Sequence, residues 1–368
     1  MIAASEDFEK NDYINGSEVM VSPDSPELVY SGRIGRNDKG KPVFIFPCTS
    51  IRFRFRGTGA AIIVTGERFY YDIFAGFIVD YDEGAETEPQ CVRLPDRKTV
   101  RIQLCEGLED KEHEIIFFKR QDACNRITIE NLVLAERGSL LKLPSKDGLK
   151  LEVYGDSVSA GEVSEACEFE GKPDPEGHEG KYSNAWYSYS WLTARKLGAE
   201  LHDIAQGGLA LLPGTGWFSA PDFVGLEQIY DKVNYYPDLD KADKWDFTQY
   251  IPDVCIVAVG QNDANPDNYM KDDYDGDKAK NWREHYRRFL LRLKELYPNA
   301  LIICSTTIMM HDSAWDRAID EVVSGFDSTM RIHHFMYSRN GAGTPGHIRV
   351  NEAKHMAEEL SAYIKGVM

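Results

Sequence analysis

Residues 149–161 read LKLEVYGDSVSAG, an apolar-rich run that leads into a serine flanked by two glycines. The run predicts a buried strand over residues 149–155. The glycines at 155 and 161 let the chain turn sharply after this strand, which exposes the hydroxyl of Ser157 and frees nearby backbone N–H groups.

Downstream of this stretch, predicted strands alternate with predicted helices. Strands are expected over residues 199–205, 253–260, 300–306 and 331–337, and helices over residues 184–198, 281–298 and 350–365. This alternation is typical of a parallel sheet with helices on both faces. Ligands of such a sheet bind beyond the carboxyl ends of the strands, so the residues that follow each strand are candidates for a functional site.

The first 140 residues have a different pattern. Residues 51–56 read IRFRFR, a strict alternation that places Ile51, Phe53 and Phe55 on one face of a strand and arginines on the other. Similar short runs recur between Gly-, Asp-, Asn- and Pro-containing turns, with no helical periodicity between them. We therefore expect an all-β sandwich or jelly roll over residues 1–145, followed by an α/β domain over residues 146–368.

Composition narrows the classes of partner. The chain has 42 Lys and Arg against 60 Asp and Glu, a net charge of −18, which disfavours binding to nucleic acids or to anionic membranes. Its seven cysteines are scattered, without a C-x-x-C pair, and the N-terminal residues lack the apolar run of an export signal. We expect a cytoplasmic protein with free thiols.

Four segments at predicted strand ends or before a helix carry polar or glycine residues. Ser157 follows the first strand, Gly207 and Gly208 follow the second, Asn262 follows the third, and His347 precedes the last helix. Each segment alone has an ordinary structural interpretation, such as a turn or a helix cap. Their occurrence together, at the edge of the sheet where ligands bind, favours a shared site.

These segments in this order resemble the SGNH (GDSL-type) hydrolases: GDSVSAG, then GG, then GQND, then a late GHIR before a final helix. With a β-sandwich in front, the chain resembles the family-two carbohydrate esterases, which join an N-terminal jelly roll to a C-terminal SGNH domain. The resemblance implies a three-layer α/β/α catalytic domain with a parallel sheet.

The resemblance also implies roles for individual residues. Ser157 would be the nucleophile and His347 the base. The N–H groups of Ser157 and Gly208 and the side chain of Asn262 would form the oxyanion hole, with Gly207 as the alternative if the glycine register differs by one. No metal and no other cofactor is implied.

One feature departs from the family pattern. SGNH hydrolases usually carry an Asp two or three residues before the catalytic His, whereas residues 343–347 read GTPGH. Either a backbone carbonyl near Thr344 or Pro345 orients the imidazole, giving a Ser–His dyad, or a distant acid does so. The dyad is our preferred expectation; Asp312 and Asp316 are candidate distant acids, although solvated loop carboxylates are the simpler interpretation of both.

Two insertions lie where they would border the site. Residues 162–183 are polar, contain Gly and Pro, and predict either a substrate lid or a contact with a partner subunit. Residues 211–250 are rich in aromatic side chains, which either stack on sugar rings or anchor the loop in a small core. Trp217 is the best candidate for sugar contact. Arg349 is a candidate substrate contact or, equally, a surface residue in the first helical turn.

The function implied is a serine esterase that removes O-acetyl groups from plant-derived oligosaccharides of the xylan or mannan type, working in the cytoplasm on shortened chains. Two alternatives stay open. A lipase or thioesterase would act on longer acyl chains and would need a broad apolar groove. A non-catalytic carbohydrate-binding protein would have a decayed site. The role of the first domain and the oligomeric state, including a homo-oligomer, are open.

Overall fold

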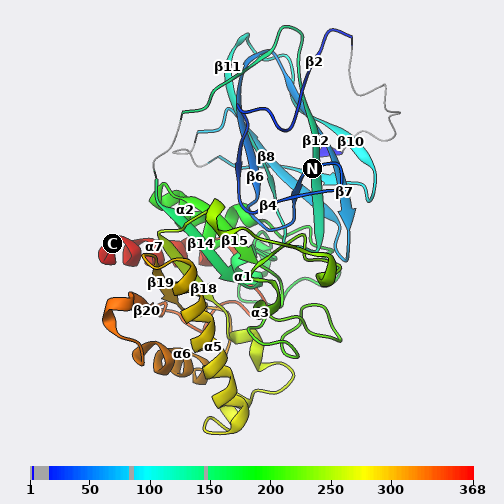
Figure 1. The fold of residues 1–368 in the computed structure, drawn as a ribbon. Helices are drawn as coiled ribbons and strands as arrows, with labels where there is room; N and C mark the ends of the chain where they lie inside the picture. Colours follow the sequence, from blue (N-terminus) through cyan, green and yellow to red (C-terminus); the bar gives the residue numbers. More distant parts are fainter. Residues whose placement is uncertain (1, 4–15, 83–86, 145–147) are drawn as a thin grey trace. The chain divides into compact units, whose positions relative to one another are not determined.

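The structure of the protein, a computed structural model, describes residues 2–3, 16–82, 87–144 and 148–368 (Figure 1). The chain divides into two compact units, one built from Met1–Asp147 with Glu179–Lys181 and the other from Gly148–His178 with Tyr182–Met368. The predicted boundary after residue 145 falls within residues 145–147, which lie outside the described residues.

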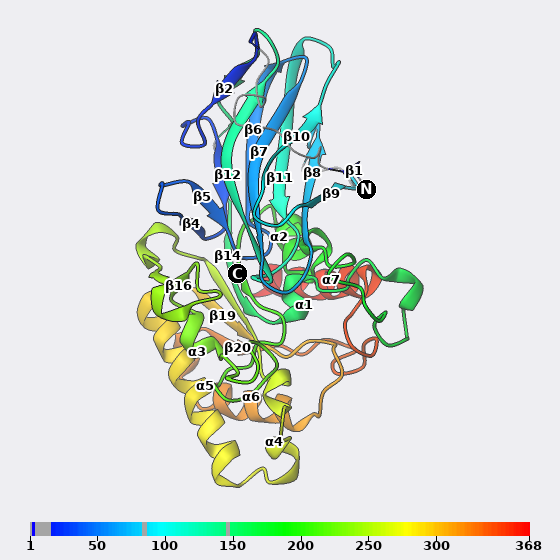
Figure 2. The ribbon, with the colours of Figure 1, turned by 90° about the vertical axis from the view of Figure 1, so that its right-hand side faces the viewer.

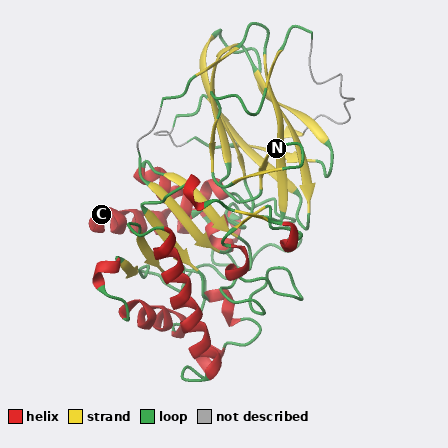
Figure 3. Ribbon diagram, in the orientation of Figure 1, coloured by secondary structure: helices red, strands yellow, loops and turns green. Residues whose placement is uncertain are grey.

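In the first unit, two mainly antiparallel sheets account for the strands of the described residues (Figure 3). One sheet contains β1 (Ile2–Ala3), β3 (Val29–Ser31), β6 (Ser50–Gly57), β8 (Ile73–Val79), β9 (Gln90–Leu94), β11 (Lys111–Lys119) and β13 (Ser139–Leu141). The other contains β2 (Val19–Val21), β4 (Ile34–Arg36), β5 (Pro42–Phe44), β7 (Ala60–Arg68), β10 (Thr99–Cys105) and β12 (Asn125–Leu134).

The alternation in β6 explains how this unit forms its core. Ile51, Phe53 and Phe55 are fully buried in a cluster that also holds residues of both sheets, such as Phe117 of β11 and Ile129 of β12. The intervening arginines of β6 lie on the opposite face, where they pair with glutamates of β11. The predicted β-sandwich is confirmed.

The second unit is built on a parallel sheet in the order β15-β14-β18-β19-β20. Its strands are β14 (Lys150–Gly155), β15 (Glu200–Ala205), β18 (Val254–Ala258), β19 (Leu301–Cys304) and β20 (Ile332–His334). A small hairpin, β16 (Lys232–Val233) with β17 (Asp243–Lys244), lies outside it. The strand order changes direction at β14, and ligands of doubly wound sheets bind at such a point.

Helices cover both faces of this sheet (Figure 2): α2 and α7 lie on one face and α5 and α6 on the other. The α-helices are α1 (Ser157–Ala160), α2 (Tyr189–Leu197), α3 (Leu226–Ile229), α4 (Tyr269–Asp272), α5 (Asp277–Leu296), α6 (Ala314–Ser324) and α7 (Val350–Val367). Short 3-10 turns are η1 (Cys167–Phe169), η2 (Ala185–Tyr187), η3 (Leu239–Lys241), η4 (Phe247–Gln249), η5 (Gln261–Ala264) and η6 (Ser328–Met330). The predicted three-layer α/β/α domain is confirmed.

One predicted helix differs in detail. Residues 184–198 do not form a single helix, because Ser188 has an extended backbone between η2 and α2. The Ser188 hydroxyl accepts a hydrogen bond from the backbone N–H of Trp191 at 3.2 Å, which caps α2. The helix ends at Gly198, as expected, with a left-handed backbone (φ 62°).

Two further properties of the described residues bear on the expectations from the sequence. None of their helices combines the length and the apolar character that a membrane crossing requires. All seven cysteines are free thiols.

Candidate active site

The nucleophile candidate sits in a tight turn between β14 and α1. Gly155 leaves no room for a side chain, because a Cβ there would lie 2.1 Å from the Ser159 hydroxyl. Gly161 ends α1 with φ +72°, and a Cβ there would lie 2.6 Å from the carbonyl oxygen of Asn184. Ser157, the first residue of α1, is therefore fixed at the carboxyl end of β14.

The hydroxyl and the backbone N–H of Ser157 are available to a ligand. Within the described part of the chain, neither its hydroxyl nor its backbone N–H forms a hydrogen bond, and the N–H at the start of a helix has no partner inside the helix. The residue is only 2% exposed. A reacting group would have to enter a nearly closed site to reach it.

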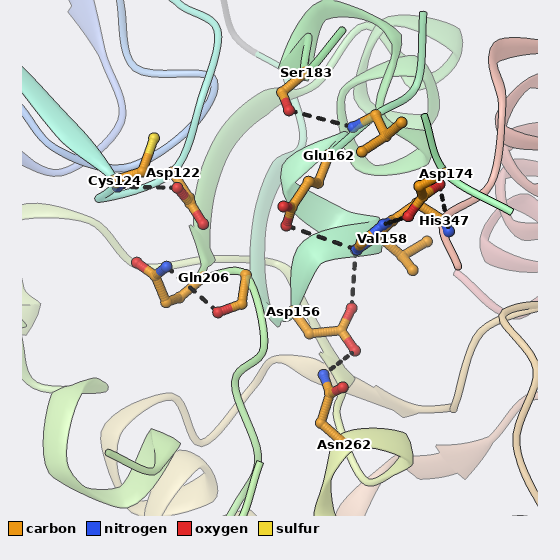
Figure 4. A network of polar contacts seen from close by, with 12 residues as sticks. Asp122, Cys124, Asp156, Val158, Glu162, Asp174, Ser183, Gln206, Asn262 and His347 are labelled. Atoms are coloured by element: carbon orange, nitrogen blue, oxygen red, sulfur yellow. Dashed lines mark hydrogen bonds and ion pairs between the residues drawn. The ribbon is translucent and has the colours of Figure 1, made fainter. Parts of the chain in front are cut away.

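Asp156 connects the turn after β14 with the loop after β18 (Figure 4). Its buried carboxylate accepts hydrogen bonds from the Val158 N–H at 3.0 Å, from Gln261 Nε2 at 2.6 Å and from Asn262 Nδ2 at 2.9 Å. Burial raises the pKa of Asp156 to about 6, although these hydrogen bonds and the charge of His347 lower it. Asp156 thus orients the turn rather than facing a substrate.

Asn262 lies at the predicted strand tip, but both hydrogens of its amide are engaged. Nδ2 donates to Asp156 and also to the carbonyl oxygen of Leu209 at 3.1 Å. Asn262 therefore stabilises the loops around the site in this state. It can donate to a negatively charged oxygen only if it gives up one of these two bonds.

Gly208 fits the second oxyanion position better than Gly207 does. Its backbone is left-handed (φ +73°), and a Cβ there would lie 2.7 Å from Trp217 Cβ. Its carbonyl oxygen accepts the Trp217 N–H at 2.8 Å. Among the described residues its own N–H has no hydrogen-bond acceptor, as an oxyanion donor requires.

Asp263 holds the loop that carries this glycine. Its buried carboxylate accepts hydrogen bonds from the N–H groups of Leu211 at 2.9 Å and Leu212 at 3.2 Å, and from the Thr215 hydroxyl at 3.3 Å. Burial raises the pKa of Asp263 to about 7, against the effect of these donors. The loops after β15 and β18 therefore form one connected unit.

His347 is oriented by a carboxylate that the sequence analysis did not single out. Its Nδ1 lies 2.7 Å from Asp174 Oδ2, and its backbone N–H donates to Asp174 Oδ1 at 3.2 Å (Figure 4). The preferred expectation of a dyad oriented by a backbone carbonyl is therefore wrong for this structure. With Nδ1 donating to Asp174, Nε2 is the nitrogen left for proton transfer.

A second carboxylate faces the other ring nitrogen. Glu162 Oε2 lies 3.7 Å from His347 Nε2, and the Glu162 N–H donates to the Ser157 carbonyl oxygen at 2.9 Å. Burial lowers the pKa of His347, but the charges of Glu162, Asp174 and Asp156 outweigh it and raise this pKa to about 9. Since Glu162 contacts both Ser157 and His347, these two residues border one site.

Arg349 is a buried clamp, contrary to the expectation of a substrate contact or a surface side chain. It is 0% exposed, and Nη1 lies 2.9 Å from Asp174 Oδ1 and donates to the His347 carbonyl oxygen at 2.6 Å. Nη2 donates at 3.4 Å to the carbonyl oxygens of Phe169 and Lys172 in the insertion. The guanidinium thus links Asp174, the backbone of His347 and the insertion. Because it is fully buried, it cannot contact a ligand.

Thr344, where an acid would stand three residues before His347, anchors the insertion instead. Its hydroxyl accepts the Gly171 N–H at 2.9 Å, and its own N–H donates to Glu352 at 3.0 Å. Gly346 also fits this arrangement. Its backbone is left-handed (φ +83°), and a Cβ there would lie 2.5 Å from Asp174 Oδ2, so a larger residue would push against the carboxylate. Thr344 and Gly346 therefore suit a site in which the acid next to His347 comes from residues 162–183.

The two candidate distant acids serve elsewhere. Asp316 Oδ2 lies 3.0 Å from His311 Nε2, and its other oxygen accepts from Asn340 at 2.9 Å. Asp312 accepts the Ala314 N–H at 2.9 Å. Neither orients His347. The expectation that both are solvated is met only in part, since Asp316 is buried.

The aromatic insertion contains one strongly exposed ring. Trp217 is 64% exposed beside Gly208, whereas Phe218 and Tyr235 are buried. The Tyr235 hydroxyl donates to Gln206 at 2.7 Å, directly before the glycine pair. Phe218 and Tyr235 therefore anchor the loop, and Trp217 keeps the exposure that contact with a sugar requires.

Asp174 and Glu162 could not be found by local spacing. Both lie in the polar insertion that the sequence places next to the site, but 173 residues separate Asp174 from His347. The only signal was that a polar loop leaves a functional strand end.

In the described ranges, no cluster of three or more His, Cys, Asp or Glu side chains is arranged to hold a metal ion.

Comparison with known proteins agrees with the resemblance. Residues 30–144 match the family described as "Carbohydrate esterase 2 N-terminal". The chain is 25% identical over 354 residues to "Cellulase/esterase CelE" of Acetivibrio thermocellus, covering 93% of this chain and 40% of that protein. It is 24% identical over 359 residues to "Acetylxylan esterase / glucomannan deacetylase" of Cellvibrio japonicus, covering 95% and 91% of the two chains.

The fold has solved counterparts. The structure of a family two carbohydrate esterase from Clostridium thermocellum in complex with cellohexaose superimposes with a TM-score of 0.74 at 24% identity, covering 92% of this chain and 98% of that one. The chain spans less than half of the first curated relative's length, 40%. The predicted resemblance to the family-two carbohydrate esterases with an SGNH-type fold is confirmed.

Proposed function

We propose that this relative of the family-two carbohydrate esterases is a serine esterase that removes O-acetyl groups from plant-derived oligosaccharides. One observation carries the proposal: an imidazole with a carboxylate on Nδ1 lies at the carboxyl edge of the sheet, beside a serine whose hydroxyl is free among the described residues. The residues concerned are Ser157, His347 and Asp174. This arrangement suits acyl transfer.

In the proposed reaction, Ser157 Oγ attacks the ester carbonyl carbon and its proton passes to His347 Nε2. The N–H groups of Ser157 and Gly208 stabilise the negative oxygen of the tetrahedral intermediate, and Asn262 joins them if it releases one of its present acceptors. The bond to the sugar oxygen then breaks, and His347 gives that oxygen the proton. Water, deprotonated by His347, releases acetate from the acyl-enzyme and the proton returns to Ser157.

Asp174 keeps the imidazole in the tautomer that this sequence of proton transfers needs and stabilises the imidazolium that forms. Hydrogen bonds and charges from His347 and Arg349 lower the pKa of Asp174 although burial raises it. The carboxylate is therefore ionised at neutral pH. This supports a Ser–His–Asp triad with its acid in the insertion.

The nature of the relatives supports sugar esters as substrates. One curated relative is named an acetylxylan esterase and glucomannan deacetylase, and one solved relative holds cellohexaose. The exposed ring of Trp217 next to Gly208 is suited to stack on a sugar ring. A xylan or mannan origin of the substrate and a cytoplasmic location stay predictions.

The experiment is to follow acetate release from acetylated xylo- and manno-oligosaccharides by the wild-type protein and by Ser157→Ala. We expect activity in the wild type and none above background in the variant. A fluorophosphonate probe should label the wild type and not the variant. Equal activity in both proteins would refute the assignment, and an unlabelled wild type would favour the non-catalytic binding alternative.

A comparison of kcat/KM on acetyl and octanoyl 4-nitrophenyl esters distinguishes the proposed esterase from a lipase or thioesterase that acts on longer acyl chains. The small exposure of Ser157 favours a short acyl group. A lipase or thioesterase would prefer the octanoyl ester, and the proposed enzyme should prefer the acetyl ester.

A further inference from the structure

The two ring nitrogens of His347 each face a different carboxylate of the insertion, one from its first residue and one from its middle (Figure 4). Asp174 of the insertion lies 2.7 Å from Nδ1, and Glu162, just after α1, lies 3.7 Å from Nε2. Asp156 at the end of β14 adds a third negative charge near the ring, and Arg349 at the start of α7 pairs with Asp174. The proposed mechanism uses Asp174 and leaves Glu162 without a role.

The position of Glu162 is fixed by the turn that presents the nucleophile. Gly161 ends α1 in a left-handed conformation, and the next N–H, that of Glu162, donates to the carbonyl oxygen of Ser157. The Glu162 side chain is 15% exposed. Because its backbone is bonded to that of Ser157 and its carboxylate lies beside His347, Glu162 is part of the site.

Nε2 is the atom that must take the proton of Ser157 and pass it to the departing sugar oxygen. A carboxylate 3.7 Å from Nε2 is too far for a hydrogen bond, but its charge stabilises the protonated ring. A protonated ring cannot act as a base. The raised pKa of His347, to which Glu162 is the strongest upward contribution, agrees with this preference.

We propose that Glu162 determines specificity: its charge near Nε2 keeps His347 protonated in the resting enzyme, and this effect ends when a sugar hydroxyl next to the ester binds the Glu162 carboxylate. The inference rests on the proposed esterase function. A carboxylate accepts hydroxyl hydrogens well, and the leaving sugar oxygen must sit near Nε2, so the hydroxyl on the adjacent sugar carbon comes within reach of Glu162. A simple aryl ester lacks this hydroxyl.

The test compares Glu162→Gln with the wild type at pH 7 on two substrates. On 4-nitrophenyl acetate the variant should show a several-fold higher kcat/KM, because more of His347 is neutral. On a monoacetylated xylo-oligosaccharide its kcat/KM should fall about tenfold, because a charge-assisted hydrogen bond to the sugar is lost. Glu168→Gln, which removes an exposed charge from the same insertion, should change neither value.

A wild-type measurement covers the case in which the variant does not fold. Full acetylation removes the free hydroxyl next to each ester, so the wild type should cleave a fully acetylated oligosaccharide about tenfold more slowly than the monoacetylated one. Equal rates on these two substrates, or a Glu162→Gln variant whose preference between sugar and aryl esters is unchanged, would overturn the proposal.

Failure of the esterase function itself gives a different result. In that case the wild type would cleave neither ester and the fluorophosphonate probe would not label Ser157. A wild type that is labelled and active but insensitive to Glu162→Gln would refute only the role of Glu162.

Discussion

Asp174 Oδ2 lies 2.7 Å from Nδ1 of His347, although 173 residues separate the two in the chain. The position three residues before His347, where an acid is usual, holds Thr344, which instead accepts the Gly171 N–H. Arg349 binds the same Asp174 carboxylate from the start of α7. The acid of the site is thus supplied by an insertion and held by residues around the base.

Asp174→Asn should lower kcat/KM about a thousandfold on an acetyl ester, because the imidazole loses the partner that fixes its tautomer. The substitution preserves the shape of the side chain, so the melting temperature should change little relative to kcat/KM. Glu176→Gln, an exposed charge removal two residues away, is the control. Activity within a few-fold of the wild type in Asp174→Asn would contradict a triad.

The pH dependence should reflect the raised pKa of His347. The base must be neutral, so kcat/KM on 4-nitrophenyl acetate should rise about tenfold per pH unit and level off near pH 9. The raised pKa of His347 also makes the stability of the fold depend on pH. Between the ordinary pKa of histidine and about 9, His347 keeps its proton in the folded state but loses it in the unfolded state. The free energy of unfolding should therefore fall as the pH rises through this window. A plateau already reached at pH 7 would contradict this.

Arg349→Lys should reduce kcat about a hundredfold with little change in KM, because the guanidinium positions Asp174 and His347 but does not touch the substrate. A lysine cannot reproduce its several hydrogen bonds. Lys365→Met, an exposed change near the end of the same helix, should have no effect. A variant that changes KM alone would indicate a direct substrate contact.

Gly346→Ala should impair the site for two reasons. The backbone there is left-handed, which costs a non-glycine residue about 1–2 kcal/mol, and the added methyl group would lie 2.5 Å from Asp174 Oδ2. Gly177→Ala is the matched control, since its φ of +61° carries the same strain but its Cβ would meet nothing within 4 Å. Both variants should melt earlier, and only Gly346→Ala should lose activity.

Trp217→Ala should raise KM for acetylated oligosaccharides about tenfold, because a stacking surface is removed. On 4-nitrophenyl acetate, which has no sugar ring, the variant should keep the wild-type kcat/KM. An equal loss on both substrates would mean that Trp217 acts through the Gly208 loop against which it lies.

The stretch that leads from β14 to Ser157 could be interpreted without a structure, because strand, glycine turn and helix are local features. The same holds for IRFRFR, whose alternation alone places Phe53 and Phe55 in the core. The edge at which Ser157, Gly208 and Asn262 lie follows from the parallel order of the strands. The break at Ser188 was missed because a side-chain cap interrupts an otherwise helical pattern.

The sequence by itself determined the two-part architecture, the edge of the sheet that carries the site and the position of Ser157 at that edge, since periodicity and strand-end position are properties of neighbouring residues. His347 was predicted from the resemblance to the SGNH hydrolases. Only the tertiary structure decided what surrounds the imidazole. Asp174 and Glu162 of the insertion and the buried Arg349 of the last helix all lie around it. Their contacts depend on how a polar loop without periodicity folds back across the sheet edge, and no spacing along the chain encodes that path.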